Sequence, residues 1–530
     1  MSVRTTRFRR AVQVARVARR GHVFRVLREI GVVGSRPATR EGARDFRRAL
    51  EELGTTYIKL GQLLSSRPDL LPDVYIEELG KLVDEVPAVP FAEIEPVIYE
   101  ELDRDLFVRI DPEPIAAASI AQIHRALLAN GRDVAVKVRR PGVAERVNED
   151  LDLIRATARL LDRHSEAAQL VQIEALTDEL EVHLRAELDF EEEAHNAELI
   201  RSFAEGRPRL VVPEVIHPYV TERVLVLEFV EGEKVTSAHG LDPELARELA
   251  RELFRFYVHQ ATVEGVYHAD PHHGNVLLTP DGRLALIDFG LLGRIDDDTR
   301  RTLSLLLFAI AQNRADDVAD LILELSLTTL DSDEPSFVHD IRRKLPRYHH
   351  RPLKQIRAGE ALADLQRISY RHGVRLPPAF ALVGKTLSQA DSIARMLDPE
   401  LDPVKLLEGE GLEAIREEAD RRLEPRALAS YAYTQFDALA RLPRRLATLV
   451  DRLENGTIKI GIVPTGLDDT EHMLRSLANR LGAAIIILGL LIASALMARV
   501  SHWIAGAGFV SSFLLGLYVV WRIIRTPGEL

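Results

Sequence analysis

The stretch from Tyr267 to Gly290 constrains the fold of this chain more than any other part of its sequence. Two short apolar strands are expected, over Val276–Leu278 and Leu284–Ile287, with a turn at Pro280-Asp281-Gly282 between them. The resulting hairpin would bring together three side chains that offer carboxylate or amide oxygens, namely Asp270, Asn275 and Asp288.

The spacing within this stretch matches the catalytic loop of a kinase and the metal-binding turn that follows it. His268 lies two residues before Asp270, Asn275 lies five residues after it, and Asp288-Phe-Gly ends the second strand. In such a site Asp270 orients the attacking hydroxyl or water, whereas Asn275 and Asp288 hold Mg²⁺ against the nucleotide phosphates. Asp-Phe-Gly alone is an ordinary turn, but both halves at this spacing predict phosphotransfer chemistry.

Length and composition exclude several classes of protein. The 530 residues suffice for roughly two to four domains, and 46% of them are hydrophobic and 28% charged, as in globular proteins. The net charge of −12 and the lack of a nucleic-acid motif indicate that nucleic acid is not a partner. The chain has no cysteine, which excludes disulfides, thiolate metal sites and cysteine nucleophiles.

Residues 1–40 form a basic N-terminal segment. Its first 28 residues contain nine arginines and no acidic residue, but they lack the unbroken apolar core of a secretory signal. A basic amphipathic helix on an anionic membrane, a transit-like peptide and an ordinary solvated helix all remain open.

Residues 41–106 are expected to form a helical N-terminal extension that contains the motif Lys59-Leu-Gly-Gln62. On a helix, Lys59 and Gln62 lie one turn apart on the same face. Gly61 within a helix costs about 1 kcal/mol relative to alanine, so we expect core side chains, another backbone or a ligand to approach it closely.

Residues 107–232 are expected to form a strand-rich lobe with a helical insert. Residues 107–138 predict three short strands, and Lys137 interrupts the apolar run of the last one. A lysine in a buried strand needs a counter-charge or a phosphate. An alanine-rich turn stands where a kinase has its glycine-rich loop, so the phosphates would be covered differently; this turn comprises Ala116, Ala117, Ala118 and Ser119.

The insert and the second lobe are expected to be mainly helical. Residues 143–202 predict a long helical region with an acidic second half, from which one glutamate should pair with Lys137. Strands over 210–230 end at a hinge between the lobes at Glu231-Gly232. Residues 233–425 form the helical second lobe, in which Lys385 lacks the glycine context of a P-loop and is expected to pack or to face solvent.

The C-terminal part predicts a membrane anchor. Residues 426–477 would form an amphipathic helix and linker, and 478–530 a transmembrane hairpin. Its spans, Leu481–Ala498 and Trp503–Trp521, contain no charged residue, and arginines flank both outer ends. The positive-inside rule then keeps both ends of the hairpin, and the body of the protein, on the cytoplasmic or equivalent side of the membrane. A buried helical hairpin in a soluble protein is the alternative.

With these motifs in place, the sequence resembles the UbiB/ABC1/ADCK (COQ8) family of atypical, protein-kinase-like proteins over about residues 45–400. The motifs that coincide in order are Lys59 to Gln62, Ala116 to Ser119 with Gln122 and His124, Lys137, Glu187-Leu-Asp189, Asp270 with Asn275, and Asp288-Phe-Gly290. The resemblance implies an α+β fold: a bilobal protein-kinase-like body with the helical N-terminal extension, and the C-terminal transmembrane hairpin of bacterial members.

The same resemblance implies roles for individual residues. Lys137 would bind phosphate and pair with Glu193, and the alanine loop would cover the nucleotide. Lys59 would reach over the active site towards Glu187 and Asp189, with Gln62 beside it, and would occlude the place of a protein substrate. Where the family usually has proline, this chain has His273, which is either a titrating donor near the phosphates or a surface ring.

The function that the resemblance implies is that of a membrane-anchored atypical kinase or ATPase that uses ATP and Mg²⁺ and supports ubiquinone biosynthesis or related lipid metabolism. A protein kinase acting on Ser/Thr in trans and a non-catalytic nucleotide-binding scaffold are the alternatives. The partners open to such a chain are membrane lipids, quinone-biosynthesis proteins or isoprenoid lipids, and a second copy in a homodimer.

Overall fold

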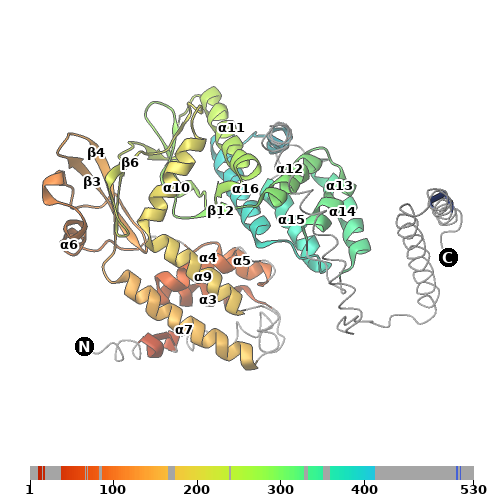
Figure 1. Cartoon of the computed structure of the whole chain (residues 1–530), viewed down its shortest axis with the longest axis horizontal. Helices are drawn as coiled ribbons and strands as arrows, with labels where there is room; N and C mark the ends of the chain where they lie inside the picture. The colour runs from red at the N-terminus through yellow and green to blue at the C-terminus, as the bar shows by residue number, and fades with distance from the viewer. Residues whose placement is uncertain are drawn as a thin grey trace, which may run out of the picture. The chain divides into compact units, whose positions relative to one another are not determined.

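The computed structural model of the chain describes residues 10–14, 16–17, 38–65, 67, 70–82, 86–164, 173–237, 240–326, 332–349, 358–411, 509–510 and 514. Met1–Ala427 and Leu428–Leu530 form two separate units, and every element named below belongs to the first. Figure 1 shows its two kinds of structure, a strand-rich part around β3, β4 and β6 and a helical part around α11 to α16.

A six-stranded antiparallel sheet forms the strand-rich lobe. Its order is β1-β3-β4-β7-β6, and β2 pairs with β3. The strands are β1 (Phe107–Ile110), β2 (Ala116–Ala117), β3 (Ala121–Leu128), β4 (Asp133–Arg139), β6 (Val215–Val220) and β7 (Val224–Glu228). Helix α6 (Phe91–Glu101) packs on one face of the sheet and α10 (Phe190–Phe203) on the other.

The alternation of side chains along β4 decides where Lys137 points. Val134, Val136 and Val138 are fully buried in the cluster that includes Ile94 and Ile98 of α6. Because successive side chains of a strand point to opposite faces, Lys137 points towards α10 instead. The predicted buried strand is confirmed, and its lysine lies on the face that meets the acidic helix.

The alanine-rich stretch is more regular than we expected. We predicted three strands over 107–138, but the structure has four, because Ala116 and Ala117 form β2 and pair with Ile123 and Gln122 of β3. Alanine has a small side chain and, unlike many loop glycines, needs no left-handed backbone angles, so it can adopt this extended conformation. Only the following residues, from Ala118 on, make the turn, in which the Ala118 N–H donates to the Ala121 carbonyl.

Within the described residues, the predicted long helical region at 143–202 contains α7 (Val143–His164), α9 (Ile173–Leu188) and α10. The break between α9 and α10 occurs at Asp189, which has extended backbone angles and caps α10. Its carboxylate accepts hydrogen bonds from the Glu191 and Glu192 N–H groups. An aspartate at this position ends one helix and begins the next because it satisfies donors that lack an intrahelical partner.

The residues expected to form the helical extension contain α3 (Arg40–Leu53), α4 (Thr55–Ser65) and α5 (Asp73–Leu79), whereas α6, which also lies within 41–106, packs on the first sheet. Helices α3, α4 and α5 contact one another, and α4 also contacts α7 and α9 (Figure 1). A Cβ at Gly61 would lie 2.3 Å from Leu82 Cδ1 and 2.7 Å from Leu50 Cδ1. The glycine therefore serves core packing, one of the alternatives that the sequence left open.

The basic N-terminal segment touches this extension through Arg10. Its guanidinium donates to both carboxylate oxygens of Asp150 on α7 and to the Leu53 carbonyl, each at 2.7 Å. Val17 is buried in the core of the extension. The described part of the segment therefore packs on the protein.

The predicted hairpin is confirmed. Strands β10 (Val276–Leu278) and β11 (Leu284–Leu286) pair antiparallel within a second sheet of order β5-β11-β10-β8. The other strands here are β5 (Leu210–Val211), β8 (Glu233–Lys234) and the separate pair β9 (Val266–His268) and β12 (Leu292–Arg294). The chain crosses from the first sheet to the second at Gly232, the expected hinge, where a Cβ would lie 2.9 Å from the Leu278 carbonyl oxygen.

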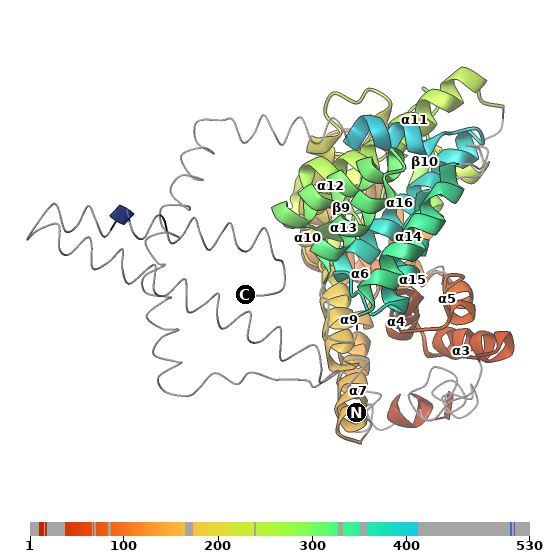
Figure 2. The same cartoon turned by 90° about the vertical axis from the view of Figure 1, so that its right-hand side faces the viewer.

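Helices complete the second lobe, as expected. They are α11 (Pro243–His259), α12 (Asp297–Ala311), α13 (Ala315–Leu325), α14 (Glu334–His349), α15 (Ala358–Arg371) and α16 (Pro378–Leu397). Figure 2 shows α12 to α16 gathered in one group, and α16 packs against both α11 and α15. One continuous core joins these helices to α10 and the second sheet.

The predicted amphipathic helix and transmembrane hairpin lie outside the described residues, apart from 509–510 and 514. Within the described part of the chain, no helix combines the length and the apolar character needed to cross a membrane.

Candidate active site

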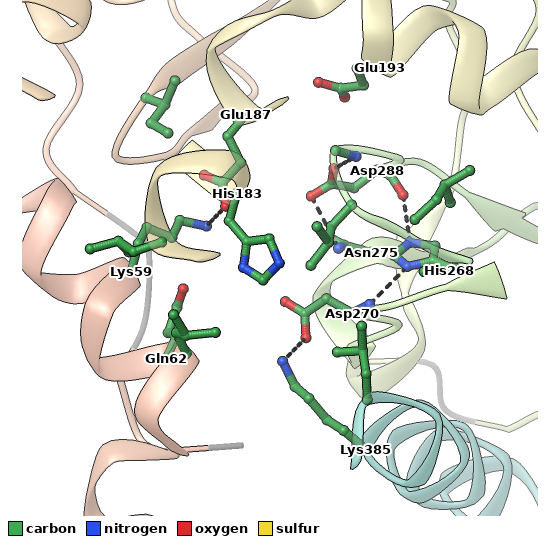
Figure 3. Close-up of a pocket in the computed structure, with 18 of the residues that line it drawn as sticks. Lys59, Gln62, His183, Glu187, Glu193, His268, Asp270, Asn275, Asp288 and Lys385 are labelled. Carbon is green, nitrogen blue, oxygen red and sulfur yellow. Dashed lines mark hydrogen bonds and ion pairs between the residues drawn. The ribbon is translucent and has the colours of Figure 1, made fainter. Parts of the chain in front are cut away.

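A cavity of about 370 Å³ lies where the first sheet, the β9–β10 loop, α4, α9 and α16 meet. Such a volume is typical of small-molecule sites. Figure 3 shows Lys59 and Gln62 on one side of it and Asp270, Asn275 and Asp288 on the other. The predicted site residues that line it are Lys59, Gln62, Ala118, Ser119, Lys137, Glu187, Glu193, Asp270, Asn275 and Asp288.

Lys137 and Glu193 form the ion pair that the family resemblance implied. Lys137 Nζ lies 2.5 Å and 2.7 Å from the two Glu193 carboxylate oxygens and 4.0 Å from Asp288 Oδ1. The two side chains are only 18% and 3% exposed. Burial would lower the pKa of Lys137, but the charges of Glu193 and Asp288 outweigh it and raise that pKa. The lysine therefore stays cationic and faces the cavity.

Asp288 and Asn275 converge across the hairpin. Asn275 Nδ2 donates to Asp288 Oδ2 at 3.2 Å, and the Gly290 N–H donates to Asp288 Oδ1 at 3.1 Å. Burial would raise the pKa of Asp288, but Lys137 together with the Gly290 N–H and other nearby groups outweighs burial and lowers that pKa, which keeps the carboxylate ionised. A carboxylate and an amide oxygen are hard ligands of the kind Mg²⁺ prefers.

These two residues fit a metal ion that arrives with a ligand. Among the described residues, no group of three or more His, Cys, Asp or Glu side chains could hold a metal ion. Mg²⁺ is commonly held by one or two protein ligands together with substrate phosphates and water. The donor set of Asp288 and Asn275 matches that pattern.

His268 joins the catalytic loop to the Asp-Phe-Gly turn. Its Nε2 lies 2.7 Å from the Asp288 carbonyl oxygen, and its Nδ1 lies 3.1 Å from the Asp270 amide nitrogen. Because the amide can only donate, Nδ1 accepts and Nε2–H donates to Asp288. Burial lowers the pKa of His268, which agrees with a neutral ring. This single ring therefore sets the positions of Asp270 and Asp288 relative to each other.

Asp270 is held from α16, which the sequence did not reveal. Lys385 Nζ lies 2.9 Å from Asp270 Oδ1, and Gln389 Nε2 donates to the same oxygen at 3.0 Å. Burial would raise the pKa of Asp270, but these two partners outweigh it and lower that pKa below its ordinary value. The prediction that Lys385 merely packs or faces solvent is wrong, because the tertiary fold turns it into the cavity.

Helix α16 is fixed to the catalytic loop at two further points. Thr386 Oγ1 donates to the His268 carbonyl at 3.1 Å, and the Tyr267 hydroxyl donates to the Ala379 carbonyl at 3.4 Å. Residues three or four apart lie on one helix face, so Leu382, Lys385 and Gln389 share a face. That periodicity was visible in the sequence, but nothing in it indicated which element the face would meet.

The extension closes another side of the cavity through ion pairs. Lys59 Nζ lies 2.7 Å from Glu187 Oε1, as predicted, and Arg67 Nη1 lies 3.2 Å from Glu179 Oε2 (Figure 3 shows the former pair). Both acidic residues belong to α9. Lys59 therefore ties α4 to α9 along the wall that faces Asp270, and Arg67, just after α4, adds a second link to α9.

Three predicted site residues lie elsewhere, and so does His273, whose role the sequence left open. Ala116 and Ala117 form β2 and do not line the cavity, whereas the neighbouring Ala118 and Ser119 do. Asp189 caps α10 with its carboxylate. Of the two acidic residues expected near Lys59, Glu187 is therefore the one with which Lys59 pairs. His273 is exposed beside His272 and does not line the cavity, which corresponds to the surface-ring alternative.

Two motif residues on β3 serve the scaffold. Gln122 exchanges hydrogen bonds with the backbone of Val89, and His124 contacts the Asp111 carbonyl at 2.9 Å. Both side chains are fully buried on the α6 face, away from Lys137. They hold the strand that leads out of the alanine turn.

His183 is a cavity residue that the sequence analysis missed. It lies on α9 one turn before Glu187 and points into the cavity between Lys59 and Asp270 (Figure 3). Burial lowers its pKa, so the ring is neutral near pH 7. Its spacing from Glu187 on a helix was the signal that could have found it.

Comparisons with known proteins point in the same direction. Three family models match the chain, described as "ABC1 atypical kinase-like domain" over residues 81–322, "UbiB helical domain" over residues 341–402 and "ABC1/UbiB kinase-like C-terminal domain" over residues 465–525. Asp270 falls within the first match and Lys385 within the second.

Among the similar proteins are two named "Probable protein kinase UbiB". The one from Pseudomonas fluorescens is 30% identical over 491 residues, which cover 91% of this chain and 90% of that protein. The one from Marinobacter nauticus is 33% identical over 67% of each chain. "Protein ACTIVITY OF BC1 COMPLEX KINASE 3, chloroplastic" from Arabidopsis thaliana is 31% identical over 67% of this chain and 51% of that protein.

Proposed function

The chain belongs to the UbiB/ABC1 family of atypical kinase-like proteins, and on that premise we propose that its cavity binds ATP with Mg²⁺ and passes the terminal phosphoryl group to water or a small acceptor. One observation carries the proposal. The buried Lys137–Glu193 pair, the converging Asp288 and Asn275, and the ionised Asp270 all line a single cavity. Phosphoryl transfer needs this set: a cation for the phosphates, oxygen ligands for a metal ion, and a carboxylate beside the attacking oxygen.

Each residue has a defined part in this chemistry. Lys137 would bind the phosphates, and Glu193 holds its ammonium in place. Mg²⁺, when bound, neutralises charge that develops on the phosphate oxygens. Asp270 would orient the attacking hydroxyl or water and accept its proton as the new P–O bond forms and the bond to the leaving phosphate oxygen breaks.

The shape of the cavity favours a small acceptor over a protein side chain in trans. Helix α4 supplies Lys59, Gln62 and Leu63 to the cavity wall, and the ion pairs of Lys59 on α4 and of Arg67 just after it tie this part of the extension to α9. A polypeptide acceptor would have to displace α4 and break both pairs to bring a hydroxyl to Asp270. Water and small acceptors need no such rearrangement.

We further propose that the protein works at a bacterial inner membrane, anchored by residues 478–530, and supports ubiquinone or related isoprenoid-lipid metabolism. The support for anchoring is the pair of uncharged runs at 481–498 and 503–521, within the C-terminal family match. The support for the metabolic role is the resemblance to UbiB. Isoprenoid lipids or quinone-biosynthesis proteins would then be the partners.

Phosphate release from ATP and Mg²⁺ tests the activity. The purified full chain would be assayed in anionic liposomes and in detergent alone, with radiolabelled ATP and with Asp270→Asn as the inactive control. We expect lipid-stimulated phosphate release without labelled protein. Label transferred to other proteins would instead favour a protein kinase. Bound ATP without turnover in either condition would favour a non-catalytic scaffold.

A further inference from the structure

We propose that Lys385, contributed by α16, binds the terminal phosphoryl group of the nucleotide and leaves Asp270 in order to do so. The inference rests on the proposed function and extends it, because it names the group that distinguishes a nucleoside triphosphate from a diphosphate. Lys385 thereby becomes a substrate-binding residue that comes from outside the two sheets and the catalytic loop.

The position of Lys385 is the first argument. Its ammonium lies 2.9 Å from Asp270 Oδ1, and its side chain is 29% exposed and lines the cavity (Figure 3). In an in-line transfer the attacking oxygen contacts Asp270 and the terminal phosphorus lies next along the same line. A cation beside Asp270 is therefore within reach of the phosphoryl oxygens.

The partition of charges in the cavity is the second argument. Lys137 is engaged by Glu193 and lies 4.0 Å from Asp288, at the end of the cavity that the metal-binding residues occupy. Lys59 is paired with Glu187 on the opposite wall. Lys385 instead pairs with the residue that would accept a proton. A general base held permanently by an ammonium is a weak base, so the pair has to separate for chemistry to occur.

The anchoring of α16 is the third argument, because it allows the ammonium to move while the helix stays in place. Thr386 binds the His268 carbonyl, and Gln389 binds Asp270 Oδ1 independently of Lys385. A lysine carries its charge on a flexible four-carbon stem. When Lys385 turns to a phosphoryl oxygen, Gln389 still orients Asp270, whose carboxylate is then freer to accept the proton.

Nucleotide selectivity tests this proposal. Dissociation constants of Mg–ATP and Mg–ADP would be measured by calorimetry on the full chain in detergent, for the parent, Lys385→Met, Lys385→Arg and the control Lys405→Met, whose side chain is 75% exposed. We expect Lys385→Met to weaken ATP about tenfold or more while ADP changes less than about threefold, since only ATP offers the charge-assisted hydrogen bond. Lys385→Arg should restore most of the preference, and Lys405→Met should match the parent.

Other results would overturn the inference. If Lys385→Met weakens both nucleotides equally, Lys385 only maintains the cavity. If it weakens neither, the pair with Asp270 is merely structural. ADP binding by Lys385→Met also tests whether this variant folds, because a misfolded variant would bind neither nucleotide. Lys385→Arg, which should bind both nucleotides, is the comparison. If the parent itself binds neither nucleotide, the proposed function fails as well, and this outcome is distinct from the first two.

Discussion

The ammonium of Lys385 lies 2.9 Å from the carboxylate of Asp270, although the two residues belong to different family matches and different elements. Helix α16 therefore does more than fill the second lobe. It supplies a cation and, through Gln389, a hydrogen-bond donor to the residue with the central role in the proposed chemistry. The helical domain and the kinase-like domain form one site.

Asp270→Asn should retain nucleotide binding and lose turnover. The amide is nearly isosteric with the carboxylate but cannot accept the proton, and general-base catalysis contributes about 10²- to 10⁴-fold. We expect phosphate release to fall by at least about 100-fold with the Mg–ATP dissociation constant within a few-fold of the parent. Asp297→Asn, a change at a side chain that is 90% exposed, is the control. Hydrolysis at the parental rate would refute the role of Asp270.

The acidic limb of the pH profile should depend on Lys385. In the free protein Lys385 and Gln389 lower the pKa of Asp270 against the effect of burial, so Asp270 stays ionised well into acid. Lys385→Met removes this cation, so less charge counteracts the effect of burial and the pKa of Asp270 rises. The acidic limb of kcat/KM, which reports the free protein, should therefore move to higher pH in Lys385→Met but not in Lys385→Arg. If the acidic limbs of the parent and of Lys385→Met superimpose, the contact between Lys385 and Asp270 is contradicted.

Lys137→Met should abolish nucleotide binding and also destabilise the fold. It removes the cation that faces the phosphates and leaves the buried Glu193 without its partner, at a cost of about 2 kcal/mol or more. Adding Glu193→Gln should recover much of the lost stability without recovering binding. Urea unfolding measures the first effect and calorimetry with Mg–ATP the second. Binding by the double variant at parental affinity would exclude Lys137 from the phosphate site.

Gly293→Ala should destabilise the β9–β12 pair. A Cβ there would lie 2.3 Å from Tyr267 Cζ, and that ring is fully buried. Overpacking of this kind costs about 1–3 kcal/mol. Gly409→Ala is the matched control, because no atom lies within 4 Å of its added Cβ and the residue is helical. Urea midpoints should fall for Gly293→Ala and stay unchanged or rise for Gly409→Ala; equal midpoints would mean that the ring yields.

Deleting residues 478–530 should release the protein into the soluble fraction after cell lysis. The deletion removes both uncharged runs, each long enough to span a bilayer. Fractionation of cells that express the full chain or the shortened chain measures the effect, with nucleotide binding as the check that the remaining chain is folded. Continued membrane association would move the anchor to the arginine-rich N-terminal segment.

The features that the sequence predicted are those specified by short-range patterns. The β10–β11 hairpin, the buried strand with Lys137 and the three helices of the extension follow from periodicity and turn residues within one element or its neighbours. The Lys137–Glu193 and Lys59–Glu187 pairs were also predicted, but from the family resemblance. The resemblance implies contacts between distant residues that local sequence spacing alone does not predict.

Local chemistry also explains two of the departures. Asp189 precedes a helix start and prefers to cap it, and Ala116-Ala117 can pair as a strand because alanine needs no unusual backbone angles. Both signals were present in the sequence, but the family resemblance assigned Ala116 and Ala117 to the nucleotide and Asp189 to Lys59 instead.

The sequence by itself therefore determined the β10–β11 hairpin, the buried strand at Lys137 and the candidate site residues Lys137, Asp270, Asn275 and Asp288, because each depends on residue types at fixed local spacing. Only the tertiary structure decided that Lys385, Gln389 and His183 join them. These three lie on helix faces whose periodicity is clear, but a helix face specifies no partner until packing places another surface against it. Because α16 packs beneath the catalytic loop, a lysine without any recognisable motif became a neighbour of Asp270.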